Sequence, residues 1–348
     1  MYVKLTESRI PFAPVLLIAP FFLWGTAMVA MKGTIQNTTP LFMAGVRLLP
    51  AGLLIVAVAA LMGRPQPQGW RAWLMISLFA LIDGSIFQGF LAEGLVRTSA
   101  GQGSVIIDSQ PLAVAVLALW LFGERIGFWG WLGLALGIVG ICAIALRAEW
   151  IGSIFTEQTS QIGLSELFAH GEWLMLVSAL SMAVGTIMIR YVCRYADPVA
   201  ATGWHMILGG LPLFALSGLC ESGQWVHMDL GGWMALAYAT VFGSAIAYGL
   251  FFYFASSGSL TSLSALTFLT PVFALLFGNL LLSEVLSQLQ WMGVSLTLVS
   301  IYLINQRDTI PSWLAKGKAT STGQPEEDSL EASDAEQALI LSKIGASK

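Results

Sequence analysis

The sequence predicts an all-α membrane protein with ten transmembrane helices, arranged as two inverted five-helix repeats. Three observations lead to this prediction. Hydrophobic residues make up 56% of the chain, charged residues only 10%, and the mean hydropathy is +0.76, whereas a soluble domain carries roughly a quarter charged residues. The apolar residues form long runs, and the third and fourth of these runs recur 160 residues later.

Each apolar run is about 20 residues long, which is the length that a helix needs to cross the hydrocarbon of a bilayer. The runs are continuously apolar and do not alternate with period two, as the strands of a membrane β-barrel would. The first run follows two cations but is long for a secretory signal, so we expect it to be an uncleaved helix. The expected spans lie near residues 11–31, 39–62, 72–94, 99–122, 127–146, 172–194, 198–219, 232–255, 260–282 and 287–305.

The chain is internally duplicated. Residues that recur at a spacing of 160 include the pairs Pro111 and Pro271, Glu124 and Glu284, Trp131 and Trp291, and Gly133 and Gly293. Because five spans are an odd number, the second copy must enter the membrane from the opposite side. The expected parts are a first repeat, a polar linker, a second repeat and a disordered cytoplasmic tail that cannot bury enough apolar surface to fold, at residues 11–146, 147–171, 172–305 and 306–348.

Loop cations predict the orientation, because cytoplasmic loops are enriched in Lys and Arg. If the N-terminus is cytoplasmic, ten such residues lie on the cytoplasmic side and three, Lys32, Arg97 and Arg147, lie outside. We therefore expect a multi-pass protein of the cell membrane with both termini in the cytoplasm.

Four short motifs occur in order along this frame: Leu23-Trp24-Gly25-Thr26, Pro40 with Arg47 seven residues on, Pro111 to Glu124, and Pro271 to Glu284. Together they resemble the EamA family of the drug/metabolite transporter superfamily, and the sequence as a whole is similar to those of its cyanobacterial and plastid members. The resemblance covers about residues 11–305. It implies ten helices, cytoplasmic termini, alternating access between two halves, and export of amino acids or related metabolites.

The second copy departs from the family pattern. Val184 stands where Trp24 would recur, and His205 replaces the arginine that corresponds to Arg47. The two halves are therefore not expected to contribute equally to a site. An intramembrane histidine by itself is more often a packing residue than a transport residue, and this is the interpretation that we favour for His205.

Charged residues inside the hydrocarbon cost about 2.5–3.5 kcal/mol on insertion scales, so they need partners or a function. Arg47, Asp83 and Asp108 lie inside spans. They could bind a zwitterion or take a proton, or they could form a static Arg–Asp pair that locks helices together; the static pair is favoured for Arg47. Gly243 and Phe268 stand near or at the equivalents of the two acids. Since Asp108 is an acid in one half only, we expect it to be the proton or substrate contact.

A small-molecule cavity is expected where polar and aromatic residues meet inside the spans. Gln88 and Tyr248 occupy equivalent positions in the two repeats, and Trp24 lies in the middle of the first span. Small-molecule sites combine apolar walls with a few hydrogen-bonding groups. Further residues that could line such a cavity are Ser109, Gln110, Thr267 and Thr270. Alternatively, Trp24 packs against glycines and Gln88 bonds between helices.

Four residues are hinge or gate candidates. Pro111 and Pro271 each remove a backbone donor and bend their helix, which could make a hinge or a static kink. Glu124 and Glu284 end the fourth and ninth spans on opposite faces of the membrane. They could close gates or cap tight turns, and the structural role is favoured.

Small residues along the fifth span would let helices approach closely. Packing within the chain is favoured over a homodimer for this face, which carries Gly130, Gly133, Gly137 and Gly140. The sequence has no Walker lysine loop, zinc motif or nucleophile signature, and no basic stripe with interleaved aromatic residues. We therefore expect no enzyme activity, no cofactor, no metal and no nucleic-acid partner.

The expected function is secondary transport. The leading hypothesis is a permease that exports small metabolites such as amino acids by alternating access, with membrane lipids around it and a proton gradient or exchange as the driving force. The alternatives are efflux of drugs or transport of nucleotide sugars by the same frame. Outside this class, the chain could be a non-catalytic membrane scaffold or a lipid-handling protein.

Overall fold

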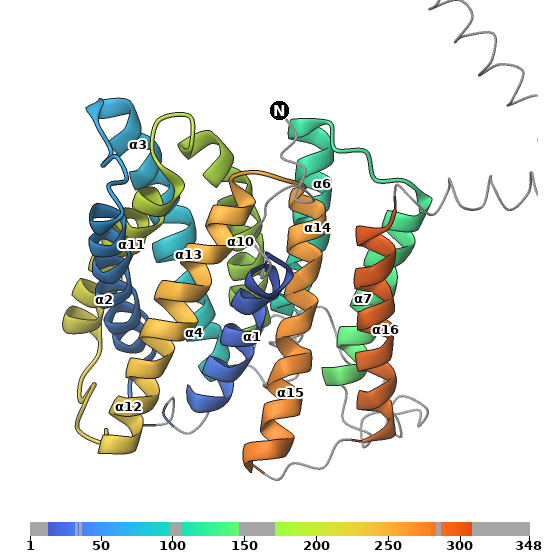
Figure 1. Ribbon diagram of the computed structural model, residues 1–348. Coiled ribbons are helices and arrows are strands. Elements are labelled where there is room, and N and C mark those ends of the chain that lie inside the picture. Colours follow the sequence, from blue (N-terminus) through green and yellow to red (C-terminus); the bar gives the residue numbers. More distant parts are fainter. Residues whose placement is uncertain are drawn as a thin grey trace, which may run out of the picture. The chain divides into compact units, whose positions relative to one another are not determined.

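The computed structural model describes residues 13–31, 34, 37–97, 106–145, 171–282 and 287–307. Every regular element in these ranges is helical. The chain up to Asn305 forms one compact unit, in which the helices pack beside one another (Figure 1). Nearly all of the expected linker, most of the expected tail and Glu284 lie outside the described residues.

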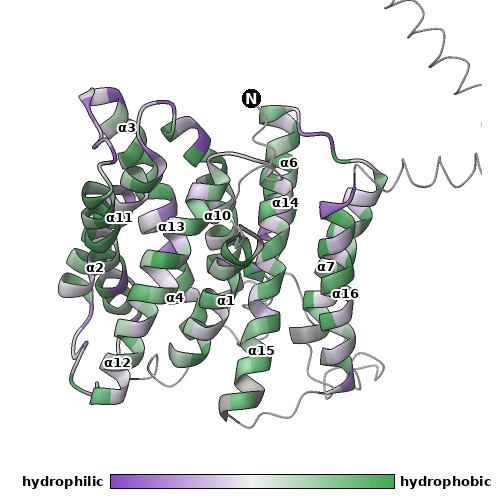
Figure 2. Ribbon diagram, viewed as in Figure 1, coloured by the Kyte–Doolittle hydropathy of each residue, from purple (hydrophilic) through white to green (hydrophobic). Residues whose placement is uncertain are grey.

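Six helical segments are long and apolar enough to cross a membrane: Pro40–Leu61, Gly69–Arg97, Trp173–Val192, Pro198–Cys220, Leu230–Ala255 and Leu260–Phe277. Within the described ranges there are also four shorter apolar helices, Val15–Ala30, Gln110–Phe122, Phe128–Ala143 and Trp291–Asn305. Apolar residues run along most of these helices, and hydrophilic residues gather at many helix ends and loops (Figure 2). The protein is therefore a helical membrane protein, as the composition predicts.

The first half contains α1 (Ala13–Met31), α2 (Pro40–Leu61), α3 (Gly69–Phe79), the π-helix η1 (Ala80–Phe87), α4 (Gln88–Arg97), α6 (Gln110–Phe122) and α7 (Phe128–Ala145). The second half contains α10 (Glu172–Val192), α11 (Pro198–Cys220), α12 (Leu230–Tyr238), the π-helix η3 (Ala239–Ile246), α13 (Ala247–Ala255), α14 (Leu260–Ala265), the 3₁₀-helix η4 (Leu266–Phe268), α15 (Leu269–Leu282) and α16 (Gln288–Asn305).

Local chemistry sets several helix ends. Proline stands at the start of α2 and of α11, where its missing N–H would have no helical partner. The carboxylate of Asp197 accepts hydrogen bonds from the amides of Val199 and Ala200 and so caps α11. Gly123 ends α6 with a φ of 65°, in the left-handed region that glycine adopts without strain.

Glycines bring helices from the two halves into close contact. The pairs α2 with α11 and α7 with α16 pack most extensively, and they stand at opposite edges of the bundle in Figure 1. A Cβ atom on Gly52 would lie 2.7 Å from the carbonyl oxygen of Gly203, and one on Gly140 would lie 2.5 Å from Thr297 Oγ1. The hydroxyl of Ser300 also donates a 2.6 Å hydrogen bond to the carbonyl of Gly133. The glycine face of the fifth span is therefore used inside the chain.

Irregular turns interrupt the helices at matching places in the two halves. The π-helices begin at Ala80 and Ala239, at the same point of the third and eighth expected spans. A turn at residues 108–109 precedes α6, and the 3₁₀-helix at 266–268 precedes α15. Pro111 and Pro271 follow these breaks, and each lacks the N–H that would bond the carbonyl four residues earlier. Both π-helices and broken membrane helices are often found at functional sites.

Candidate functional site

Two equivalent residues of the two halves meet inside the bundle. Gln88, the first residue of α4, donates a hydrogen bond of 2.7 Å from its side-chain Nε2 to the hydroxyl of Tyr248 on α13. Both residues are buried, with 2% and 5% of their surface exposed. Since they are 160 residues apart, this contact lies where the duplicated halves face each other.

Arg47 reaches the same place from α2. Its Nη2 donates to Gln88 Oε1 and its Nε donates to Ser244 Oγ on η3, each over 3.4 Å. Hydrogen bonds of this length to neutral oxygens are weak. A guanidinium has five donors in a fixed fork that matches a carboxylate. A carboxylate that came within reach would therefore form shorter bonds with Arg47 than these two residues do.

Aromatic rings form the apolar side of this cluster. The ring centre of Trp24 lies 5.0 Å from that of Tyr248 and 5.2 Å from that of Phe251. The ring of Phe21 lies against both Trp24 and Phe251. The indole N–H of Trp24 is buried and has no acceptor among the described residues. Buried donors nearly always have a partner, so this N–H is available to a ligand. We refer to Trp24, Arg47, Gln88 and Tyr248 as the central cluster.

Asp83 pairs with His205 across the two halves. Asp83 Oδ2 on η1 lies 3.2 Å from His205 Nε2 on α11, and each side chain is only 1% exposed. The imidazole also stacks on Phe79 with ring centres 4.1 Å apart. His205 thus packs against an aromatic ring and is also the partner of Asp83, an acid for which the sequence suggested Arg47 as a static partner.

A glycine on the neighbouring helix makes room for this acid. A Cβ atom on Gly185 of α10 would overlap Asp83 Oδ1. That oxygen is buried and has no hydrogen-bond partner in the described part of the chain. The carboxyl of Asp83 therefore fills the space between α10 and α11, both of which belong to the second half.

Asp108 occupies the helix break instead of the central cluster. It is 8% exposed and lies in the turn before α6. Two residues on, Gln110 donates a 3.3 Å hydrogen bond to the hydroxyl of Thr186 on α10. No hydrogen bond or ion pair of Asp108 with another described residue is present. Its equivalent, Phe268, ends the 3₁₀-helix η4, so both residues lie at the breaks that precede Pro111 and Pro271.

Several buried polar side-chain atoms without a partner lie on residues that were predicted to form the site. Within the described ranges, such atoms include Trp24 Nε1, Asp83 Oδ1, Gln110 Oε1 and Thr270 Oγ1. Each unpaired buried group costs about 1–3 kcal/mol. Their number on residues expected to line a cavity is typical of a site that binds a polar ligand or water. The same part of the chain shows no group of three His, Cys, Asp or Glu side chains that could hold a metal ion.

Carboxylates at helix ends tie the two halves together. The Glu124 carboxylate accepts hydrogen bonds from the amides of Leu260 and Thr261 over 2.9 and 3.2 Å, and from the Thr261 hydroxyl. The sequence favours a structural role for Glu124, such as the cap of a tight turn. In the structure its carboxylate caps α14 of the other half, because α14 begins beside the end of α6. We call this contact the Glu124 latch.

Glu221 makes the corresponding contact at the start of α2, which was not predicted from the sequence. Its carboxylate accepts from the amides of Leu41 and Phe42 over 2.9 and 3.0 Å, and from Thr39 Oγ1 over 2.7 Å. Burial disfavours the charge, but these bonds outweigh it, so the pKa of Glu221 is lowered. A glutamate directly after an apolar span was the only signal in the sequence. We call this contact the Glu221 latch.

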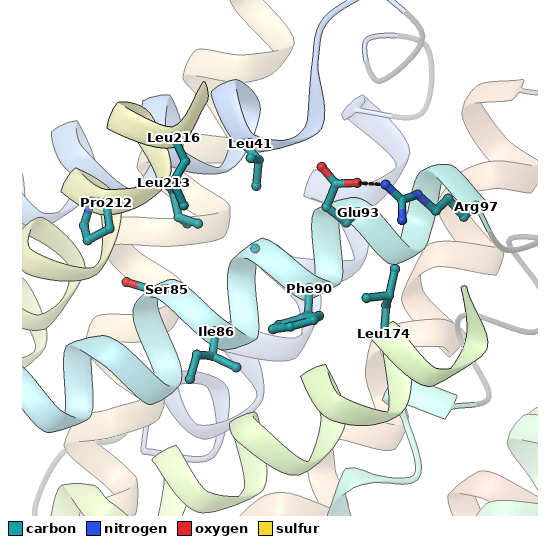
Figure 3. A pocket seen from close by; sticks show the side chains of 11 residues that line it. Leu41, Ser85, Ile86, Phe90, Glu93, Arg97, Leu174, Pro212, Leu213 and Leu216 are labelled. Carbon is teal, nitrogen blue, oxygen red and sulfur yellow. Dashed lines mark hydrogen bonds and ion pairs between the residues drawn. The ribbon is translucent and has the colours of Figure 1, made fainter. Parts of the chain in front are cut away.

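A groove of about 330 Å³ lies beside α4 and α11 and is lined mainly by apolar side chains (Figure 3). Beside it, Arg97 forms a 2.7 Å ion pair with Glu93, one helical turn earlier on α4. None of the six expected substrate or coupling residues is among its lining residues, which are Leu41, Ser85, Ile86, Gly89, Phe90, Glu93, Arg97, Leu174, Pro212, Leu213 and Leu216.

Known proteins resemble this chain in sequence and in fold. The profile of the EamA-like transporter family matches residues 11–146 and 169–306. The chain is 62% identical over 296 residues to an uncharacterised transporter of Synechocystis sp., which covers 84% of this chain and 90% of that protein. It is 53% identical over 293 residues to a chloroplastic WAT1-related protein of Arabidopsis thaliana, which covers 83% of this chain and 68% of that protein.

More distant likenesses extend to other bacteria and to a solved structure. The chain is 26% identical to the inner membrane transporter YedA of Escherichia coli over 83% of this chain and 89% of that protein. A protein crystal structure matches with a TM-score of 0.68 at 16% identity, over 83% of this chain and 94% of that chain, which shows a shared fold. The family profile matches most of the chain, and the chain therefore belongs to the EamA-like transporter family, with cyanobacterial and plastid affinity.

Proposed function

We propose that the protein is a secondary transporter that exports amino-acid-like metabolites from the cytoplasm across the cell membrane. In this proposal, ten helices form two inverted five-helix repeats with both termini in the cytoplasm, and the substrate is bound where the repeats meet. The hydrogen bond between Gln88 and Tyr248 carries the proposal. It joins equivalent residues of the two halves and has Arg47 on one side and Trp24 on the other.

The substrate class follows from the chemistry of the central cluster. The guanidinium of Arg47 suits a carboxylate, and the unpaired indole N–H of Trp24 suits a second acceptor oxygen. The rings of Trp24, Tyr248 and Phe251 suit an apolar or aromatic side chain. A small carboxylate with an aromatic side chain uses all of these groups, so L-phenylalanine is a suitable probe.

The matching irregularities support motion between two similar halves. The π-helices η1 and η3 and the breaks before Pro111 and Pro271 recur at matching positions. In the proposed orientation the Glu124 latch lies at the cytoplasmic end and the Glu221 latch at the outer end. Both latches consist of hydrogen bonds that can form and break without a change in covalent structure. Alternating access requires that at least one of them opens in each cycle.

Counterflow in proteoliposomes tests this function. Vesicles with the full-length protein and unlabelled L-phenylalanine inside should take up external radiolabelled L-phenylalanine transiently and with saturation. Phenethylamine, which has the ring and the amine but no carboxylate, should compete poorly because it offers the guanidinium of Arg47 no carboxylate to bind.

Flux without saturation would contradict a carrier. Equal competition by phenethylamine would contradict the role of Arg47, and competition by a nucleotide sugar or a cationic drug but not by L-phenylalanine would move the substrate class to one of those ligands. Expression in bacteria tests the direction: an exporter should raise resistance to the toxic analogue p-fluorophenylalanine, and increased sensitivity would indicate import.

A further inference from the structure

We propose that Asp83 and His205 form a proton-binding pair that couples proton movement to transport by holding the two halves together when it is protonated. This inference rests on the transport function proposed above and adds a coupling site that is separate from the central cluster. At this pair, a titratable group of the first half contacts a titratable group of the second half inside the bundle.

The Asp83–His205 pair lies between segments of the two halves that would move relative to each other during transport. Asp83 belongs to η1 of the first half, and its carboxyl lies between Gly185 on α10 and His205 on α11 of the second half. Any motion of one half against the other must therefore change the distance between the carboxyl and the imidazole. Because both side chains are 1% exposed, the proton can exchange with water only after such a motion.

The two hydrogen bonds of the His205 imidazole require two hydrogens. His205 Nδ1 lies 2.6 Å from the carbonyl oxygen of Thr202. A carbonyl has no hydrogen to donate, so Nδ1 must carry one. The hydrogen bond of 3.2 Å between Nε2 and Asp83 Oδ2 then needs a second hydrogen. It is provided either by a neutral Asp83 facing a neutral His205 or by an Asp83 carboxylate facing an imidazolium.

Loss of that hydrogen changes attraction into repulsion. The carboxylate would then face the lone pair of Nε2, and a buried charge without a donor is costly. Water or a separation of η1 from α11 would be needed to relieve it. One proton bound therefore favours the closed contact, and one proton released favours the open one. A proton taken up on one side of the membrane and released on the other in this way drives a two-state motion.

The surroundings limit which other groups could take this role. Within the described residues, Tyr248 on α13 is the neighbouring group that interacts electrostatically with both Asp83 and Arg47. Other described ionisable side chains on the helices that pack against η1 include Arg71 on α3, Glu93 and Arg97 on α4, and Arg190 and Tyr191 on α10.

Glycines bring η1 and α11 into close contact beside the pair. A Cβ atom on Gly84 would lie 2.7 Å from the Cα of Gly209, so the two backbones touch. Ser85 Oγ donates a 2.9 Å hydrogen bond to the carbonyl of Gly209. A change in the Asp83–His205 distance is therefore transmitted directly to the packing of these two segments.

Transport by a D83N variant tests the coupling. An asparagine can still hydrogen-bond His205, so the helix contact is kept, but the amide cannot release a proton. In proteoliposomes, D83N should keep L-phenylalanine counterflow, which needs no net proton movement, and should lose accumulation driven by a pH gradient. D108N, which removes the other buried acid of the same half, is measured in parallel to distinguish the two acids. The matched control is E93Q, in the partly exposed ion pair with Arg97 on α4, which should keep both activities.

Gradient-driven accumulation at the parent level in D83N would overturn the proposal, because a purely structural pair tolerates this change. Loss in D108N with D83N unaffected would overturn it in favour of Asp108. A D83H/H205D double variant, which exchanges the two groups, should recover part of the gradient-driven accumulation that D83N lacks.

A second measurement does not depend on the substrate. Infrared difference spectra of the full-length protein in lipid nanodiscs, recorded during a pH titration, should contain a band of the pair, from the Asp83 carboxyl or the His205 imidazole, that D83N lacks and D108N retains. If the parent shows no counterflow but this band is present, the proposed substrate class fails and the proton site stands. If parent and D83N spectra are identical, the proton site fails whatever is transported.

Discussion

Gln88 and Tyr248 are equivalent residues of the duplicated chain, and they share a buried hydrogen bond of 2.7 Å across the two halves. In the proposed arrangement of two inverted repeats, equivalent residues can touch only near the pseudo-symmetry axis that relates the repeats. The amide and the phenol would then mark this axis inside the bundle. They differ in chemistry, so the site on the axis is asymmetric although its frame is duplicated. Four predictions follow from this geometry and from the packing around it.

Replacement of Tyr248 by phenylalanine should weaken substrate binding. The change keeps the ring packed on Trp24 but leaves the Gln88 amide without its acceptor. An unpaired buried donor costs about 1–3 kcal/mol, so the KM for L-phenylalanine counterflow should rise roughly tenfold. Y253F is the matched control, because Tyr253 is exposed on the same helix. Equal KM values for Y248F and the parent would show that this bond is not part of the site.

Replacement of Arg47 by lysine should impair transport although the charge is kept. Lysine is a point charge and cannot hold a carboxylate with two parallel N–H groups. Loss of one charge-assisted bond of about 1.5–3 kcal/mol predicts a KM at least about tenfold higher. R64K is the control, since Arg64 is partly exposed and pairs with Asp197 at 3.6 Å away from the cluster. A normal KM in R47K would exclude bidentate binding.

Replacement of Gly209 by alanine should destabilise the protein. The new Cβ atom would lie 2.5 Å from the Cα of Gly84 and 2.8 Å from the carbonyl of Ala80, so α11 and η1 would have to move apart. Overpacking of this kind costs about 1–3 kcal/mol, which a thermal unfolding curve in detergent would show as a lower Tm. G218A is on the same helix and meets nothing within 4 Å. Its Tm should not fall, and equal losses in both variants would contradict the argument.

The Glu221 latch should make stability depend on pH. Burial disfavours the charge of Glu221, but hydrogen bonds in the folded state outweigh it and hold the pKa of this carboxyl below its ordinary value of 4.5. Its contribution is therefore complete above pH 4.5 and is lost as the pH falls through the lower folded pKa. E221Q should thus be less stable than the parent at neutral pH, and the difference should shrink in acid.

E93Q provides the comparison for this pH dependence, because the ion pair of Glu93 with Arg97 is solvent-exposed and such pairs contribute little. Thermal unfolding of the parent and both variants over a pH series gives the measurement. A difference between E221Q and the parent that stays constant into acid would mean that the charge of Glu221 is not what holds α2.

The sequence alone determined the membrane class, the recurrence of residues 160 positions apart and the family. These properties depend on composition, on run length and on spacing along the chain, all of which can be read without coordinates. It also placed Gln88 and Tyr248 at equivalent positions and Trp24 beside them in the expected site. For the same reason, the helix breaks before Pro111 and Pro271 could be expected from proline chemistry.

Only the tertiary structure decided which polar groups meet. It paired Asp83 with His205, placed Arg47 on Gln88 and Ser244, and brought Glu221 to the start of α2. Helices that are apolar all round have no polar face to indicate their rotation. That rotation is set by glycine contacts such as Gly84 on Gly209, which depend on the whole bundle. The sequence therefore names the polar residues, and the packing of the helices selects their partners.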